Sequence, residues 1–266
     1  MLTVGIIGYG SIGRDVSNYI VTDRAGNVEL QAILVRDRKQ IASHLPAPLF
    51  EDQADRFFAR GFDIVVEAAG HNAVKQFAER SLRGGSDFIA VSVGAFADRE
   101  LYEKTLKIAA ETGKRLIIPS ASIGGLDRIA AAAVGTIEHV TLTSKKPPRA
   151  WYGTIVEQRI DLEQVTEPVC VFEGPARESA LLFPESINVS AALSLAGIGF
   201  DKTSVRVFID PTVSKNTHHI SASGSFGEIQ LELSNIPSAN PKTGYITAMS
   251  IAKVLKNLST PLMIGL

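Results

Sequence analysis

Short apolar runs alternate with stretches of helical spacing through the first half of the chain, and this regularity ends near residue 135. Each run is continuous, which is typical of a strand that is buried on both faces of a sheet. We expect strands at 3–7, 28–35 and 62–67 and within 87–98 and 115–127, and helices at 11–20, 73–82, 98–111 and 124–135. Strands that alternate with helices predict a parallel sheet with right-handed crossovers.

The second half follows a different pattern, in which apolar and polar residues alternate with the period of a strand. We expect strands at 137–146, 152–160, 167–174, 202–211, 216–224 and 227–235, and helices at 176–199, interrupted near Pro184, and from Asn240 to about Leu258. Successive strands with short connections favour antiparallel pairing. The predicted fold class is α/β: a Rossmann-type parallel-sheet domain (1–120), an α+β domain with a mixed or antiparallel sheet (121–240), and a C-terminal helix (241–266) that returns to the first domain.

Composition excludes several classes of protein. The 266 residues carry a net charge of −1 and no block of like charge, so we expect no nucleic-acid or membrane partner. No apolar run reaches the roughly 18 residues of a membrane span, and the N-terminus lacks the features of a signal peptide, which favours a cytoplasmic location. The single cysteine, Cys170, lies in an apolar run where we expect it to be buried, and it excludes an internal disulfide or a cysteine zinc site. We expect no metal site.

The first apolar run ends in a glycine turn, GYGSIG, that opens the first helix. In this motif Gly8 permits the tight turn, Gly10 lets the backbone approach a pyrophosphate, and Gly13 allows the helix to pack closely on the strand. The helix N-terminus, which includes Ser11 and Ile12, offers unpaired N–H groups and a positive dipole end to phosphates. The turn therefore predicts a dinucleotide cofactor, NAD or NADP.

Two further strand ends belong to the predicted cofactor site, because ligands bind outside the carboxyl ends of the strands in such sheets. The second strand ends at Arg36 and Asp37. An acidic residue here binds the ribose hydroxyls of NAD, whereas an arginine accepts the extra phosphate of NADP, so the choice of cofactor stays open. The third strand is followed by Ala69 and Gly70, which form the turn before the next helix.

Two adjacent histidines lie in the strand-like stretch 216–224. Successive side chains on a strand point to opposite faces, so His218 and His219 cannot face the same way. Asn216 shares the face of His218 and could orient either its ring or a substrate carboxylate. Histidine changes its protonation near neutral pH, which makes it the natural group for proton transfer.

Eight motifs, taken in order, resemble the L-aspartate dehydrogenases over nearly the whole chain: GYGSIG, EAAGHNAV, SVGAFAD, PSASIGGLD, SKKPP, FPESINVSAALSLAG, DPTVSKNTHHI and NPKTGYITAMSIAKVL. The resemblance implies a homodimer of two-domain subunits that oxidises L-aspartate at its α-carbon with NAD or NADP. The product, iminoaspartate, hydrolyses to oxaloacetate and ammonia and is also a precursor for NAD biosynthesis.

Carried over residue by residue, the resemblance implies that His218 is the catalytic histidine and that Ser122 and Asn188 contact the cofactor. Many members of the family carry alanine where this chain has Ser122, which is consistent with a contact through the backbone. His219 occupies a variable-looking position, and we interpret it as the outward-facing member of the pair.

A dicarboxylate substrate needs cations or N–H donors around it. The start of the predicted last helix supplies both, because its dipole adds positive potential. The candidate substrate-binding residues are Asn216, Asn240, Lys242 and Thr243. Lys145 and Lys146 end a predicted strand, and one of the two could also reach the substrate.

Two other hypotheses fit the same plan. A dihydrodipicolinate reductase-like or homoserine dehydrogenase-like oxidoreductase also combines a nucleotide-binding domain with a mixed-sheet domain. A non-catalytic NAD(P)-binding redox sensor would leave His218 and Asn216 without a chemical role. Turnover of L-aspartate, and its loss in a His218→Ala variant that keeps its cofactor affinity, separates these hypotheses.

Overall fold

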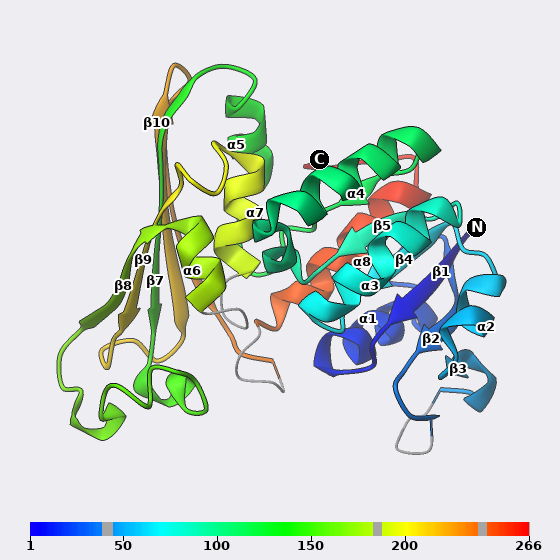
Figure 1. Cartoon of the computed structure of the whole chain (residues 1–266), viewed down its shortest axis with the longest axis horizontal. Helices are drawn as coiled ribbons and strands as arrows, with labels where there is room; N and C mark the ends of the chain where they lie inside the picture. The colour runs from blue at the N-terminus through cyan, green and yellow to red at the C-terminus, as the bar shows by residue number, and fades with distance from the viewer. Residues whose placement is uncertain (39–44, 183–187, 239–243, 266) are drawn as a thin grey trace. The chain divides into compact units, whose positions relative to one another are not determined.

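The structure of the protein, a computed structural model, describes residues 1–38, 45–182, 188–238 and 244–265 (Figure 1). The chain forms two compact units, Met1–Pro119 with Ala248–Leu266 and Ser120–Thr247. The helices and strands of the first unit are β1 (Leu2–Ile7), α1 (Ser11–Val21), β2 (Val28–Leu34), β3 (Phe50–Glu51), α2 (Ala54–Ala59), β4 (Ile64–Glu67), α3 (His71–Arg83), β5 (Asp87–Ala90), α4 (Arg99–Thr112), β6 (Leu116–Ile117) and α8 (Ile246–Ser259). Those of the second unit are α5 (Leu126–Ala132), β7 (Ile137–Lys146), β8 (Val169–Pro175), α6 (Ala176–Leu182), α7 (Asn188–Ala196), β9 (Ser204–Ile209), β10 (Asn216–Gly224) and β11 (Gly227–Asn235).

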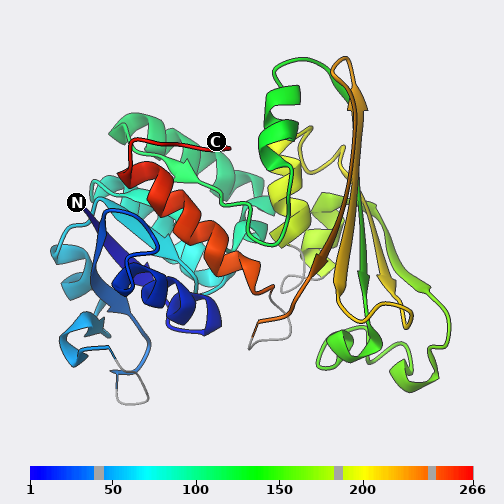
Figure 2. The ribbon, with the colours of Figure 1, turned by 180° about the vertical axis from the view of Figure 1, so that it is seen from behind.

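The first unit contains the predicted parallel sheet. Its strand order is β3-β2-β1-β4-β5-β6, and every neighbouring pair is parallel. Helices α3 and α4 lie on one face of this sheet, and α1 and α8 lie on the other, as the two opposite views show (Figures 1 and 2). This strand order is that of dinucleotide-binding folds, in which the order reverses between the first and fourth strands and the ligand binds at that point.

The C-terminal helix α8 returns to the first unit, as the sequence predicts. Its Ile251 and Leu255 are buried in one core with Val4 and Ile6 of β1 and Val16 of α1. Continuous burial of one helix face explains why the apolar positions of this segment recur with helical spacing.

The start of α8 differs from the prediction. The helix begins at Ile246 instead of near Asn240, because Gly244 forms a β-bridge with Pro237 and the N–H of Tyr245 donates to the carbonyl of Ile236. The backbone just before the helix is therefore tied to the strand-like segment that follows β11. The predicted substrate residues Asn240, Lys242 and Thr243, like the predicted break at Pro184, lie outside the described residues.

The second unit contains a mixed sheet with the order β11-β10-β7-β9-β8. β7 and β9 are parallel, and the other neighbouring pairs are antiparallel. The expected direct pairing of β9 with β10 is wrong, because β7 lies between them. The N–H of Asp210 donates to the carbonyl of Lys146, so the connection after β9 passes the end of β7 before β10 begins.

Helices α5, α6 and α7 lie on one face of this sheet, which we call the helix face (Figures 1 and 2). No helix in the described part of the chain covers the opposite face, which we call the open face. Burial along β7 alternates, and Val140, Leu142, Ser144 and Lys146 are the buried positions. The phase of this alternation decides which polar side chains of the unit are enclosed.

The predicted strand at 152–160 is wrong, because this segment forms successive turns. The N–H groups of Thr154 and Glu157 donate to carbonyls three residues earlier, and that of Ile160 donates to the carbonyl of Val156. Gly153 adopts a φ of 74°, which ends any extended run. These N–H groups are thus satisfied within the segment, without a neighbouring strand.

Cys170 is exposed, so the expectation of burial is wrong. It lies on β8, an edge strand of the mixed sheet, opposite Phe208 of β9. An apolar run at the edge of a sheet with one uncovered face need not be enclosed.

No helix in the described ranges is both long enough and apolar enough to cross a membrane. The described residues also contain no group of three or more histidine, cysteine, aspartate or glutamate side chains arranged to hold a metal ion.

Candidate active site

The three glycines of the first turn have the surroundings that a pyrophosphate cradle requires. Gly8 has a φ of 98°, and a Cβ atom there would lie 2.7 Å from the carbonyl oxygen of Ala68. A Cβ atom on Gly13 would lie 2.2 Å from the carbonyl oxygen of Gly8, so only glycine lets α1 pack this closely. A Cβ atom on Gly10 would meet nothing within 4 Å, so this glycine is bordered by open space, where a ligand would approach.

The N-terminus of α1 is also suited to phosphate. Gly10 precedes the helix, no side chain among the described residues caps it, and its first turn contains no acidic residue. Ser11 and Ile12, at its start, are half-buried. The N–H groups and the positive end of the helix dipole are therefore directed at the open space beside Gly10. This arrangement fits a dinucleotide cofactor.

The neighbouring turn at Ala69 and Gly70 is held by Glu67, which is not among the predicted site residues. Glu67 has 0% of its surface exposed, and its carboxylate accepts hydrogen bonds from the N–H groups of Ala69 (2.7 Å), Gly70 (2.8 Å) and Ser92 (3.0 Å) and from the hydroxyl of Ser92 (2.9 Å). Burial raises the pKa of this carboxyl, although the hydrogen bonds oppose the shift. An acidic residue at the end of the buried run IVVE was the available sequence signal.

Arg36 and Asp37 follow β2 at the same carboxyl edge of the sheet as the glycine turn. Arg36 is exposed and Asp37 is half-buried. The N–H of Gly8 donates to the carbonyl of Leu34, so the end of β2 lies against the turn. Both residues remain candidates for the cofactor ribose.

His218 lies on the helix face of the second unit, as the strand alternation predicts, and His219 is exposed on the open face. His218 is only 4% exposed. Its Nδ1 lies 2.9 Å from the Oγ of Ser144 on β7. Burial, and to a lesser degree the charge of Lys146, lowers the pKa of this imidazole to about 4. The ring is therefore neutral in the free protein at neutral pH, because burial moves its pKa below the range of an unperturbed histidine.

Asn216 begins β10 two residues before His218 and is buried on the same face. Its position in the sheet is directly opposite Asn235 of β11. The turn before it is fixed by Asp210, whose carboxylate accepts a hydrogen bond from the N–H of Thr212 (2.9 Å) and lies 3.5 Å from the Nζ of Lys145. The shared face that the sequence predicts for Asn216 and His218 is confirmed.

Ser144 and Lys146 are buried beside His218, and Ser144 belongs to no motif of the sequence that predicts a role for it. The alternation of β7 contained the signal, since the phase that buries Val140 and Leu142 also turns Ser144 and Lys146 inward. The alternation does not predict the register between β7 and β10, which sets Ser144 opposite His218.

Ser122 and Asn188 belong to the second unit. The carbonyl of Ser122 accepts a hydrogen bond from the Nδ2 of Asn235, and its hydroxyl is 2.8 Å from that of Thr247. Asn188 is half-buried at the start of α7. Ser122 thus ties the loop before α5 to the end of β11 and to Thr247, the last residue of the second unit.

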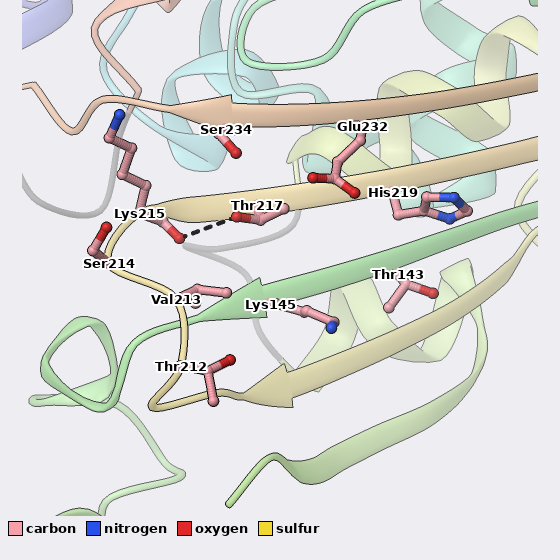
Figure 3. A pocket seen from close by; sticks show the side chains of 10 residues that line it. All are labelled: Thr143, Lys145, Thr212, Val213, Ser214, Lys215, Thr217, His219, Glu232 and Ser234. Carbon is pink, nitrogen blue, oxygen red and sulfur yellow. Dashed lines mark hydrogen bonds between the residues drawn. The ribbon is translucent and has the colours of Figure 1, made fainter.

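A pocket of about 590 Å³ opens on the other side of the same sheet (Figure 3). Its lining residues include His219, Lys145, Thr217 and Glu232. The lining contains neither His218 nor any residue of the glycine turn.

Comparison with known proteins gives consistent matches along the whole chain. A family model described as "Aspartate dehydrogenase, C-terminal" matches residues 127–258, and one described as "Homoserine dehydrogenase, NAD binding domain" matches residues 8–119. The chain is 37% identical to L-aspartate dehydrogenase of Methanococcoides burtonii, with 100% of both chains covered. It is 38% identical to L-aspartate dehydrogenase of Brucella anthropi, with 96% of each covered. The crystal structure of aspartate dehydrogenase from Thermotoga maritima is 28% identical, with 100% of both chains covered and a TM-score of 0.79.

Proposed function

This chain belongs to the L-aspartate dehydrogenase family, and from that premise we propose that it converts L-aspartate to iminoaspartate, which hydrolyses to oxaloacetate and ammonia. The chemistry supplied by the bound cofactor, NAD or NADP, is acceptance of a hydride from the α-carbon. One observation carries the proposal: a chain whose glycine turn fits a pyrophosphate also buries a histidine, His218, among polar side chains on a sheet face.

The residues of the first unit bind and orient the cofactor. Gly10 and the N–H groups at Ser11 and Ile12 receive the pyrophosphate, while Gly8 and Gly13 shape the turn. We assign the ribose to Arg36 and Asp37, and further contacts to Ala69 and Gly70, whose turn Glu67 holds in place. Ser122 and Asn188 complete the proposed cofactor contacts.

His218 transfers the protons of the hydrolytic half of the reaction. When its Nδ1–H donates to the Oγ of Ser144, Nε2 carries the lone pair and can take a proton from the water that attacks the imine. The serine hydroxyl can both donate and accept, so Ser144 holds the ring in one orientation through either tautomer. Proton return from the ring to the departing nitrogen then releases ammonia.

The substrate site is assigned to Asn216 and to Asn240, Lys242 and Thr243, of which the last three lie outside the described residues. A buried asparagine two positions from the catalytic histidine offers amide donors to a carboxylate.

We also propose a homodimer in the cytoplasm with a role in NAD biosynthesis. Family membership supports the dimer, and the open face of the mixed sheet offers an uncovered surface for it. A single cysteine suits a reducing compartment.

The direct test is to mix the purified protein with L-aspartate and either NAD or NADP and to follow the absorbance of the reduced nicotinamide. We expect turnover with L-aspartate and none with homoserine, and the ratio of the two cofactor rates assigns the roles of Arg36 and Asp37. The His218→Ala variant should lose turnover and keep its affinity for reduced cofactor. Cofactor binding without turnover in the unaltered protein would favour a redox sensor instead.

A further inference from the structure

Two adjacent lysines end β7, and the sheet separates them. Lys145 points to the open face, where it lines the pocket with His219 and lies 3.5 Å from the carboxylate of Asp210 (Figure 3). Lys146 points to the helix face and is only 6% exposed. The two side chains have the same chemistry and follow each other in the chain, but only one is enclosed on the face that carries His218.

Lys146 is a neighbour of His218 across the sheet. Ser144 lies directly opposite His218, and Lys146 is the next residue of β7 on the same face, at the diagonal position that long side chains can reach. Its charge acts on the imidazole, since it contributes to the low pKa of His218. The ammonium and the imidazole therefore belong to one cluster of polar side chains on the helix face.

The ammonium is also held in place. Its Nζ lies 5.3 Å from the centre of the Trp151 ring, and Trp151 is fully buried in the segment that follows β7. A cation over an aromatic face is attracted to the ring, and the ring limits the positions that the lysine end can adopt. Such an arrangement aims the charge instead of leaving it on a mobile stem.

An enclosed lysine beside a proton-transfer histidine costs free energy that an apolar side chain of similar volume would not, which favours a functional role over a structural one. The proposed substrate carries two carboxylates, and an ammonium is a strong donor to either of them. We propose that Lys146 is a substrate-binding residue whose ammonium binds a carboxylate of the amino diacid next to His218. This inference rests on the proposed function and adds a contact to it.

The test compares Lys146→Met, which keeps the apolar stem and removes the charge, with Lys146→Arg, which keeps a cation. The matched control is Lys215→Met, which removes the charge of an exposed lysine that lines the pocket on the opposite face. The affinity for succinate, an unreactive dicarboxylate, is measured by calorimetry with reduced cofactor present, and the KM values for L-aspartate and for the cofactor are measured in parallel. Lys146→Gln serves in place of Lys146→Met if the latter does not fold.

We expect the Met or Gln variant to weaken succinate binding and to raise the KM for L-aspartate by about 10- to 100-fold, the range for a lost hydrogen bond to a charged group. The KM for cofactor should stay within about twofold of the unaltered protein, and Lys146→Arg should restore at least part of the loss, a pattern that a merely structural lysine would not give. Lys215→Met should bind succinate as the unaltered protein does. Unchanged succinate affinity in the Met or Gln variant, or no succinate binding by the unaltered protein, overturns the inference. Failure to oxidise L-aspartate overturns the proposed function alone, because the effect of Lys146 on succinate affinity is measured without any reaction.

Discussion

At the scale of single residues, the protonation of His218 is the property on which the chemistry depends. Burial beside Ser144 and the charge of Lys146 keep its imidazole neutral in the free protein. A dicarboxylate bound nearby would oppose the charge of Lys146 and raise the pKa of the ring. The ring would then accept a proton more readily once substrate is present than before it binds.

The low pKa of His218 also makes stability depend on pH. Between its ordinary value of 6.5 and about 4, the unfolded chain binds a proton at this residue and the folded chain does not. The free energy of unfolding should therefore fall as the pH drops through this window, by on the order of 3 kcal/mol from this residue. Urea titrations of the unaltered protein and of His218→Gln at pH 7 and pH 4 measure it, and the variant should lose less stability. The same pH dependence in both proteins would contradict the prediction, and His219→Gln, an exposed neighbour, is the control.

At the scale of elements, strands buried on two faces or paired in a regular hairpin were predictable. β7, β10 and β11 have the bounds that their alternation predicts. The turns at 152–160 and the start of α8 at Ile246 were not predictable. The local sequence pattern does not show whether another strand lies beside a segment to pair with it. Tertiary context decides such segments.

The candidate site divides in the same way. The glycine turn and the shared face of Asn216 and His218 follow from spacing alone. Ser144 and Glu67 do not, since their roles depend on which strands are neighbours and in what register. Sequence spacing therefore predicts the residues that one element presents, but not the partners that a second element brings to them.

The turn between β1 and α1 allows a test that separates folding from binding. Gly10→Ala adds a methyl group in open space at a φ of −75°, which alanine tolerates, so stability should change by less than about 1 kcal/mol. Reduced cofactor should bind it at least about tenfold more weakly, because the methyl group occupies the approach of the pyrophosphate. Gly13→Ala should instead destabilise the fold by roughly 1–3 kcal/mol through its clash with the Gly8 carbonyl. Fluorescence titration with NADH and thermal unfolding distinguish the two, and unchanged NADH affinity in Gly10→Ala would refute the assignment.

At the scale of the whole molecule, the first unit is built from both ends of the chain. Its sheet comes from residues before Pro119. Its core is completed by α8, which follows the second unit in the sequence. The N–H of Asn27 donates to the hydroxyl of Ser259, so the end of α8 is also tied to the loop before β2. Stability of the cofactor-binding unit therefore depends on a helix that lies more than 120 residues beyond its last strand.

Two substitutions on α8 measure this dependence. Leu255 is fully buried in the core of the first unit, whereas Met249 on the same helix is 41% exposed. Leu255→Ala should lower the free energy of unfolding by about 2–5 kcal/mol, the cost of a cavity in a packed core, and Met249→Ala by less than about 1 kcal/mol. Thermal unfolding with and without NADH shows which transition is affected, because a bound ligand shifts only the unit that holds it. If α8 completes the cofactor-binding unit, the transition that NADH shifts is the one that Leu255→Ala lowers. Equal effects of the two substitutions, or a loss confined to the transition that NADH does not shift, would contradict that dependence.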